Sequence, residues 1–171
     1  MFALAIGFLN LLLASLLTGA MFGFFLALNP KGLSGPDYVR MQQRAIGTID
    51  PVMPALGAAT IAVTAVAAAM ARHDGVRFGL LVAAVAGFLA AGLITRLRNQ
   101  PINRVIMGWP VAAPPEHWTQ LRDRWWRWHV ARLVLGVVGL SALILADTFN
   151  VHLTEEYAHD QPYCIVQLRA A

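Results

Sequence analysis

Four long apolar runs constrain the fold of this chain more than any other feature of the sequence. The runs expected to cross a membrane cover residues 2–28, 51–71, 78–97 and 129–148. A helix needs about 20 mostly apolar residues to span the hydrocarbon core of a bilayer. Because no water is available there to hydrogen-bond the backbone, each run is expected to be a helix rather than an open strand. The sequence therefore predicts an all-α, four-transmembrane-helix bundle.

The low content of charge supports a lipid-facing surface. Charged residues make up 13% of the 171 residues, whereas about 25% is usual in a soluble domain. We assign residues 1–149 to a four-helix membrane domain and residues 150–171 to a polar C-terminal tail. The one cysteine, Cys164, cannot form a disulfide, a CxxC redox pair or a cysteine zinc site within a single chain. Histidines and glutamates in the tail match no metal-binding spacing.

The distribution of basic residues predicts the orientation. Of the 13 lysines and arginines, only Arg72, Arg77 and Arg169 lie on the side shared by the N-terminus, the second connection and the tail. The other ten lie in or beside the first and third connections. The positive-inside rule places those connections in the cytoplasm and both termini outside, with the inner (cytoplasmic) membrane as the expected location. The basic composition thus has a topological explanation, and no nucleic-acid partner is expected.

The first connection, residues 29–50, predicts a short amphipathic helix. Proline at position 30 ends the first span. Ser34 to Asp37 resembles a new helix start, and apolar side chains then recur at helical spacing as far as Ile49. This helix is expected on the membrane surface or under the bundle. Asp50 is expected to cap the N-terminus of the second span, with a catalytic role as the alternative.

The third connection leads into a helix that should extend beyond the membrane. Pro115 suits the first turn of a helix, and no helix breaker follows until about Phe149. At about 1.5 Å per residue, such a helix is longer than a bilayer is thick. Steps of three and four residues place aromatic, titratable and cationic side chains on one stripe of it. The stripe comprises Trp118, Leu121, Arg122, Trp125, Trp128, His129 and Arg132.

This stripe has two interpretations. Tryptophans and arginines at the end of a span commonly form an interfacial belt, which accounts for Trp126 and Arg127. His129 and Arg132 differ because they fall at or inside the fourth run. Ionisable residues within a span usually face the bundle interior or a water-filled cavity and mark function. We therefore take His129 and Arg132 as candidate functional residues.

Two asparagines follow the third run. Asn99 and Asn103 lie one turn apart if the helix persists, but Pro101 between them favours a break. One interpretation is a helix end with two capping amides. The other is an irregular backbone beside a cavity, the only setting in which such a backbone is tolerated at membrane depth.

These residues together resemble the anthrone oxygenase-like family of small four-helix membrane proteins. The most distinctive pieces are Asn-x-Pro-x-Asn at residues 99–103 and Trp-x3-His-x2-Arg at residues 125–132, and the resemblance covers most of residues 5–147. Named members oxidise an anthrone to an anthraquinone with dioxygen and are described as needing no conventional cofactor. By position, the resemblance implies catalytic roles for His129, Arg132, Asn103 and Asn99, and substrate-binding roles for Trp125, Trp118, Thr95 and Gln42.

The chemistry of these side chains is consistent with that activity. An anthrone has an acidic C–H next to its carbonyl system, and an imidazole such as that of His129 is a suitable base for removing it. Arg132 and the asparagine amides could stabilise the developing oxyanion. Trp125 and Trp118 could stack on a flat aromatic substrate. The hypothesis is a membrane-embedded, oxygenase-like protein that oxidises a small aromatic substrate with dioxygen.

Two other functions stay open at this point. One is a metal-dependent membrane redox protein, with His129 as the first candidate ligand. The other is a non-enzymatic accessory subunit of a larger membrane complex. No cofactor is expected, although a metal is not excluded. The expected partners are the lipid bilayer and a small hydrophobic aromatic substrate, with a homo-oligomer or a larger complex as open possibilities.

Overall fold

The computed structural model describes the backbone of residues 1–27 and 29–168, and the side chains of residues 1–27 and 29–148. Its helices are α1 (Phe2–Ala27), α2 (Gly35–Ile49), α3 (Met53–Met70), α4 (Gly75–Ile94), α5 (Gln100–Met107) and α6 (Trp118–Leu168). A π-helical turn, η1 (Thr95–Asn99), joins α4 to α5. No strand occurs within these described ranges. The predicted all-α fold is confirmed.

In the part of the chain that the structure describes, four helical segments are long and apolar enough to cross a membrane. They are Phe2–Ala27, Met53–Met70, Gly75–Met107 and Trp118–Thr148. Large apolar side chains such as Phe8, Leu93 and Val138 are exposed on the outside of the bundle. Soluble proteins rarely expose large apolar patches, so these faces belong against lipid. The chain is an integral membrane protein.

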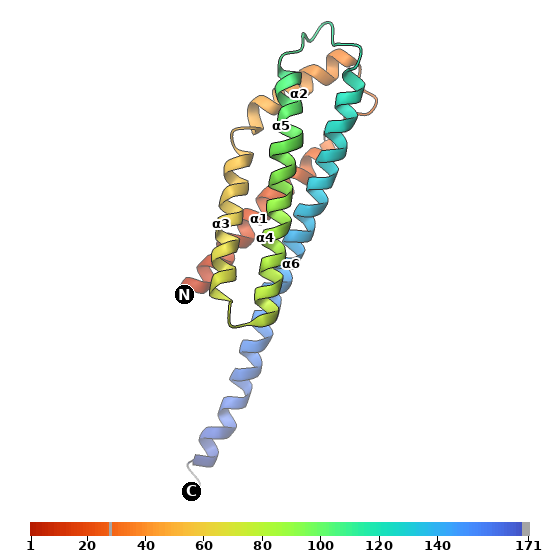
Figure 1. Ribbon diagram of the computed structural model, residues 1–171. Coiled ribbons are helices and arrows are strands. Elements are labelled where there is room, and N and C mark those ends of the chain that lie inside the picture. Colours follow the sequence, from red (N-terminus) through yellow and green to blue (C-terminus); the bar gives the residue numbers. More distant parts are fainter. Residues whose placement is uncertain (28, 169–171) are drawn as a thin grey trace.

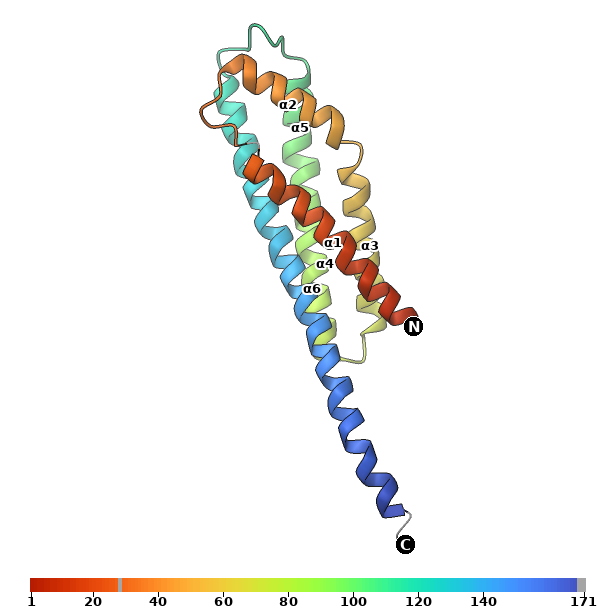
Figure 2. The same cartoon turned by 180° about the vertical axis from the view of Figure 1, so that it is seen from behind.

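The helices are arranged with two distinct ends. Figure 1 shows α1, α3, α4 and α6 alongside one another with α2 across one end, and Figure 2 shows the same arrangement from behind. The loop between α5 and α6 lies at the α2 end, whereas the N-terminus and the turn between α3 and α4 lie at the other end (Figure 1). The first and third connections therefore share one end, as predicted. Which side of the membrane that end faces stays a prediction.

The last helix continues further than the sequence suggested. α6 runs past the other helices toward the C-terminus (Figure 1) and ends at Leu168, rather than near Phe149. The predicted polar tail is thus helical in its backbone as far as Leu168. The side chains of the tail, including that of Cys164, lie outside the described residues.

Small residues let α4 and α6 approach closely. A Cβ atom at Gly87 would lie 3.1 Å from the carbonyl oxygen of Leu135 and 3.3 Å from the Cα atom of Gly139. A Cβ atom at Gly139 would lie 3.1 Å from the ring of Phe88. Membrane helices associate mainly through such tight packing, since lipid offers no hydrophobic driving force between them. The backbone contact between these two helices therefore depends on glycine at both positions.

The sequence of α2 explains both its start and its position. Ser34 caps the helix, because its Oγ accepts a hydrogen bond from the backbone N–H of Asp37 at 3.3 Å. The predicted helix start is confirmed. One face of α2 is buried, including Tyr38 and Gln42. Gln43 Nε2 donates to the carbonyl oxygens of Ile106 and Trp109, each at 2.9 Å. These bonds tie α2 to the end of α5 and the turn that follows it.

The structure corrects the expected role of Asp50. Its backbone N–H bonds to the carbonyl of Ile46, so Asp50 ends α2 instead of capping α3. The N-cap position of α3 is Val52, which makes no side-chain cap. Pro54 lies in the first turn of α3 and removes one of the N–H groups that a cap would satisfy. The carboxylate of Asp50 is therefore free to point elsewhere.

The expected break at Pro101 is replaced by a π turn. The backbone N–H of Gln100 bonds to the carbonyl of Thr95, five residues earlier, which widens the helix just before the proline. Proline has no N–H and crowds the carbonyl four residues before it. The wider turn accommodates this while the helix continues through Met107. Asn99 and Asn103 consequently lie on one continuous helical segment, and both side chains are buried.

The glycine contact between α4 and α6 generates a stability prediction. Gly87→Leu should lower the free energy of unfolding by about 1–3 kcal/mol, because the new side chain meets backbone atoms that cannot yield. Gly79→Leu is the matched control on the same helix, since a Cβ atom there would meet nothing within 4 Å. Thermal unfolding in detergent measures both. Equal stability of the two variants would contradict the close approach of α4 and α6.

Candidate functional site

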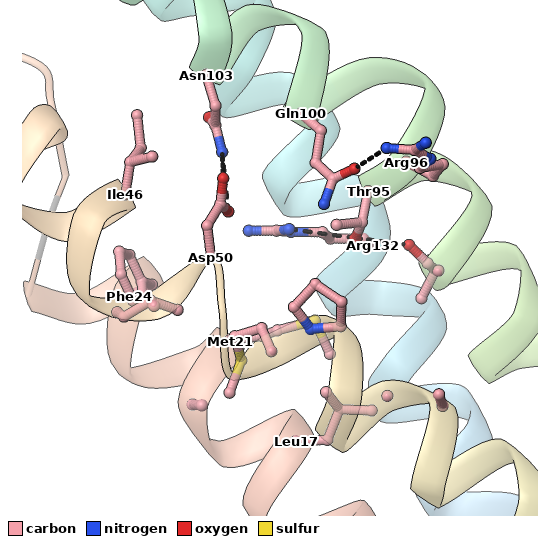
Figure 3. Close-up of a pocket in the computed structure, with 18 of the residues that line it drawn as sticks. Leu17, Met21, Phe24, Ile46, Asp50, Thr95, Arg96, Gln100, Asn103 and Arg132 are labelled. Carbon is pink, nitrogen blue, oxygen red and sulfur yellow. Dashed lines mark hydrogen bonds between the residues drawn. The ribbon is translucent and has the colours of Figure 1, made fainter. Parts of the chain in front are cut away.

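A cavity of about 260 Å³ lies inside the bundle near the end covered by α2. All four spanning segments and α2 contribute to its wall, which is mostly apolar. Polar side chains gather on part of the wall, and Figure 3 shows how those of Asp50, Asn103 and Arg132 lie. The polar residues of the wall are Gln42, Asp50, Thr95, Arg96, Gln100, Asn103 and Arg132. A mainly apolar cavity with a few convergent polar groups is the common form of a small-molecule site.

Asn103 connects three parts of the chain through its amide. Its Oδ1 accepts a hydrogen bond from Trp125 Nε1 at 2.8 Å. Its Nδ2 donates to both carboxylate oxygens of Asp50, at 3.1 and 3.2 Å. Because indole Nε1 only donates and a carboxylate only accepts, the amide has one possible orientation. Asn103 thereby holds the α2–α3 junction and α6 in register across α5.

Trp125 is held at the cavity wall from several sides. Asn99 Nδ2 donates to the backbone carbonyl of Trp125 at 3.2 Å. The indole ring lies flat against the imidazole of His129, with centroids 5.2 Å apart and an interplanar angle of 3°. Trp125 is 4% exposed and still lines the cavity, so it is a fixed aromatic wall.

Arg132 spans from the buried imidazole to the cavity. Its Nη2 lies 3.0 Å and its Nε 3.3 Å from Nδ1 of His129. Its Nη1 donates to Thr95 Oγ1 at 3.2 Å, and Thr95 in turn donates to the carbonyl of Ala91 at 2.9 Å. The guanidinium carbon lies 5.9 Å from the centre of the Trp125 ring. These contacts fix the cation at the edge of the cavity.

The contact with Arg132 also fixes the state of His129. A guanidinium only donates hydrogen bonds, so Nδ1 must be the unprotonated acceptor. The proton of the neutral ring then lies on Nε2, which is buried and has no hydrogen-bond partner within the described residues. His129 is fully buried and does not line the cavity, because Trp125 covers one face of its ring.

Asp50 and Arg132 face the same space without touching. Figure 3 shows the guanidinium of Arg132 pointing toward the carboxylate of Asp50. No ion pair within 4.0 Å joins them among the described residues. An acceptor-only group and a donor-only group therefore lie across a gap in an otherwise apolar cavity.

The structure brings together most of the site residues that the sequence predicted. Gln42, Thr95, Asn103, Trp125 and Arg132 line the cavity. Asn99 and His129 lie behind them, where Asn99 bonds the backbone of Trp125 and His129 bonds Arg132. The motif residues thus form one connected cluster.

Trp118 lies apart from this cluster. It stacks on Tyr38, with ring centroids 5.5 Å apart, and the guanidinium of Arg122 lies 5.0 Å from its ring. It does not line the cavity and instead fastens α2 to the start of α6. Burial beneath Trp118 raises the pKa of Tyr38 above its ordinary value, so the phenol stays neutral.

Asp50, Arg96 and Gln100 line the cavity although the sequence did not make them first candidates for the site. A carboxylate directly before an apolar run is typical of a helix N-cap, so the pattern at Asp50 favours capping over the catalytic alternative. Arg96 and Gln100 bond each other at 2.9 Å across the π turn. That turn, and not the sequence spacing, places both of them on the cavity wall.

Metal ligands are sparse in the part of the chain that the structure describes. No group of three His, Cys, Asp or Glu side chains there lies close enough together to hold a metal ion. The metal-dependent alternative therefore finds no such ligand set within residues 1–27 and 29–148.

Comparison with known proteins gives one match. A family model described as "Anthrone oxygenase" matches residues 43–142, more than half of the chain. The matched stretch contains Asp50, the π turn and the segment from Trp125 to Arg132. No curated protein and no solved structure matches the chain.

The hydrogen bonds of Asn103 generate a second stability prediction. Asn103→Asp removes both donors to Asp50 and places two carboxylates side by side, so it should cost about 1–3 kcal/mol of the free energy of unfolding. In the double variant with Asp50→Asn, an amide at position 50 again faces a carboxylate at position 103, so at least half of the lost free energy of unfolding should be recovered. Thermal unfolding in detergent of the wild type, the single variants and the double variant measures this.

Asn29→Asp is the control for the added charge. Asn29 is exposed and uses only its oxygen, which accepts from the backbone of Lys31, so the substitution should leave stability unchanged. A double variant less stable than Asn103→Asp alone would contradict the assigned orientation of the amide.

Proposed function

Because the chain belongs to the anthrone oxygenase family, we propose that it is a membrane-embedded oxygenase that oxidises a flat, anthrone-like aromatic molecule with dioxygen. The observation that supports this most directly is the cavity itself, an apolar space with a fixed cation and an aromatic wall on its inner side. Its position within the bundle suits a hydrophobic substrate that partitions into the bilayer.

The reaction needs a carbanion that dioxygen can attack. Removing a proton from the methylene group of an anthrone leaves an electron-rich anthrolate, whose negative charge resides largely on oxygen. Addition of dioxygen at the methylene carbon, followed by protonation, gives a hydroperoxide. Loss of water from the hydroperoxide gives the quinone. One anthrone and one dioxygen thus become one anthraquinone and one water, and no external reductant is consumed.

Arg132 suits the stabilisation of the anthrolate oxygen. Its guanidinium is positioned by Thr95 and His129 and lies at the cavity edge. A cation fixed in advance in a water-poor site stabilises a developing oxyanion without reorganisation. Trp125 suits the stacking of a flat aromatic ring, and Gln42 supplies a buried polar group with no partner at Nε2 within the described residues.

In this proposal His129 and Asn99 do not contact the substrate, and they position the residues that do. The lone pair of His129 accepts from Arg132, so in this arrangement the imidazole positions the cation and supports Trp125. Asn99 holds the backbone of Trp125. We therefore assign both as positioning residues, in place of the direct acid–base role for His129 that the sequence alone suggested.

The first test is turnover of an anthrone under air by the purified protein in detergent. The wild type should convert anthrone to anthraquinone with one dioxygen consumed per substrate. Arg132→Gln should lower kcat/KM by about 100-fold or more, because one preorganised oxyanion donor is lost. Arg104→Gln, which changes an exposed arginine of α5 outside the cavity, should leave turnover unchanged.

Elemental analysis of the same samples separates the alternatives. A wild-type protein that does not turn over any anthrone would contradict the proposed function. If activity requires a metal bound in a one-to-one ratio, and His129→Ala loses both the metal and the activity, the metal-dependent alternative is correct.

A double-variant cycle tests whether His129 acts through Arg132. His129→Leu should lower kcat because the guanidinium loses the acceptor that orients it, whereas His129→Gln, which keeps an acceptor, should recover part of the rate. In a protein that already carries Arg132→Gln, His129→Leu should cause little further loss of kcat, because the effects of substituting residues that act as one unit are not additive. Multiplicative losses in the double variant would show instead that His129 makes an independent contribution to the chemistry.

A further inference from the structure

The proposed reaction needs a proton acceptor that reaches the substrate, and the cavity wall offers few candidates. Its ionisable side chains are Asp50, Arg96 and Arg132. Arginine stays protonated and offers no lone pair. His129 does not line the cavity, and its Nδ1 lone pair faces Arg132. Among the described residues, Asp50 is therefore the one ionisable acceptor on this wall.

Within the described residues, the side chain of Asp50 neither caps a helix nor forms an ion pair, the two structural roles that a carboxylate usually has near a helix end. It does not cap α3, and it forms no ion pair within 4.0 Å in the described part of the chain. Its hydrogen-bond donor is one amide nitrogen, Asn103 Nδ2. A carboxylate has about four lone-pair positions, so most of its acceptor capacity remains available. A charged group in an apolar cavity is costly, and such residues in membrane proteins usually mark function.

The placement of Asp50 and Arg132 around one cavity suits the two reacting groups of an anthrone. The carbonyl oxygen and the methylene group lie at opposite corners of the central ring. A base for the methylene and a cation for the oxygen must therefore face each other across the substrate, without forming an ion pair of their own. Asp50 and Arg132 point into the same space in this way (Figure 3).

We propose that Asp50 is the catalytic base of this site, which accepts the methylene proton of an anthrone-like substrate while Arg132 holds the opposite oxygen. The inference rests on the proposed function. The C–H bond breaks, its proton moves to the carboxylate, and its electron pair enters the ring system as the anthrolate. After dioxygen adds, Asp50 returns the proton to the peroxide anion. Asp50 then accepts the second C–H proton while the O–O bond breaks and hydroxide leaves, and the carboxyl group passes that proton to the hydroxide, which gives the quinone and water.

An aspartate can act as the base for such a step when hydrogen-bond donors stabilise the oxygen anion that forms. Ketosteroid isomerase combines an aspartate base with hydrogen-bond donors at the enolate oxygen, and the donors make the carbon acid easier to ionise. Arg132 supplies the corresponding donor here. Asn103 holds the carboxylate at a fixed position on the other side, which keeps the acceptor aligned with the substrate.

The test compares Asp50→Asn with wild type in anthrone turnover. The variant keeps an oxygen that can accept from Asn103, so it should fold, which thermal unfolding checks. Its kcat should fall by about 100-fold or more with little change in KM. A substrate deuterated at the methylene should show a larger isotope effect on kcat in the variant, because proton removal becomes rate-limiting. Asp37→Asn, at an exposed ion pair on α2, is the control and should retain full activity.

Chemical rescue separates a base from a structural residue. Asp50→Ala should be nearly inactive, and added formate or acetate should restore turnover in proportion to its concentration. Wild-type turnover combined with an active Asp50→Asn variant would overturn the role of Asp50 and leave the proposed function standing. Loss of activity in folded Asp50→Asn with neither the isotope effect nor rescue would also overturn it. No turnover by the wild type would overturn both proposals.

Discussion

The structure of the site depends on one side chain, the amide of Asn103. It accepts from the indole of Trp125 and donates to the carboxylate of Asp50, and so joins α5, α6 and the α2–α3 junction. Hydrogen bonds are electrostatically stronger inside a protein than in water, and an unpaired polar group is correspondingly costly there. A single network with defined donors and acceptors therefore sets the relative position of three segments that apolar packing alone would leave free to slide.

The π turn makes this network possible. In a regular α-helix, Pro101 would remove a hydrogen bond and crowd the preceding turn. The bond from Gln100 to Thr95 absorbs that conflict in one widened turn, and the helix then continues, with Asn103 buried at the cavity. The same turn aligns Thr95 with Arg132 and places Gln100 on the cavity wall. π turns are frequent at functional sites, and here the turn positions side chains on both sides of the proline.

The cluster has a clear division between residues at the cavity and residues behind it. Trp125, Arg132 and Asp50 line the space that a substrate would occupy. His129 and Asn99 fix the first two of these from the far side. A guanidinium and a carboxylate kept apart in an apolar space would normally attract each other or draw in water. The two groups are held apart here, Asp50 by Asn103 and Arg132 by Thr95 and His129.

The sequence by itself determined the four spans, the amphipathic helix before the second span, the family and most of the clustered residues. It did so because length and apolar content decide which segments enter a bilayer, and because the spacing from Trp125 to Arg132 places their side chains on one face of any helix. It did not determine how Asp50 is used, that Pro101 lies in an unbroken helix, or that Trp118 lies away from the cavity. Those outcomes depend on contacts between segments distant in the chain. Asn103 and Asp50 are 53 residues apart and Arg132 and Thr95 are 37 apart, and only packing of the helices brings such partners within hydrogen-bond distance.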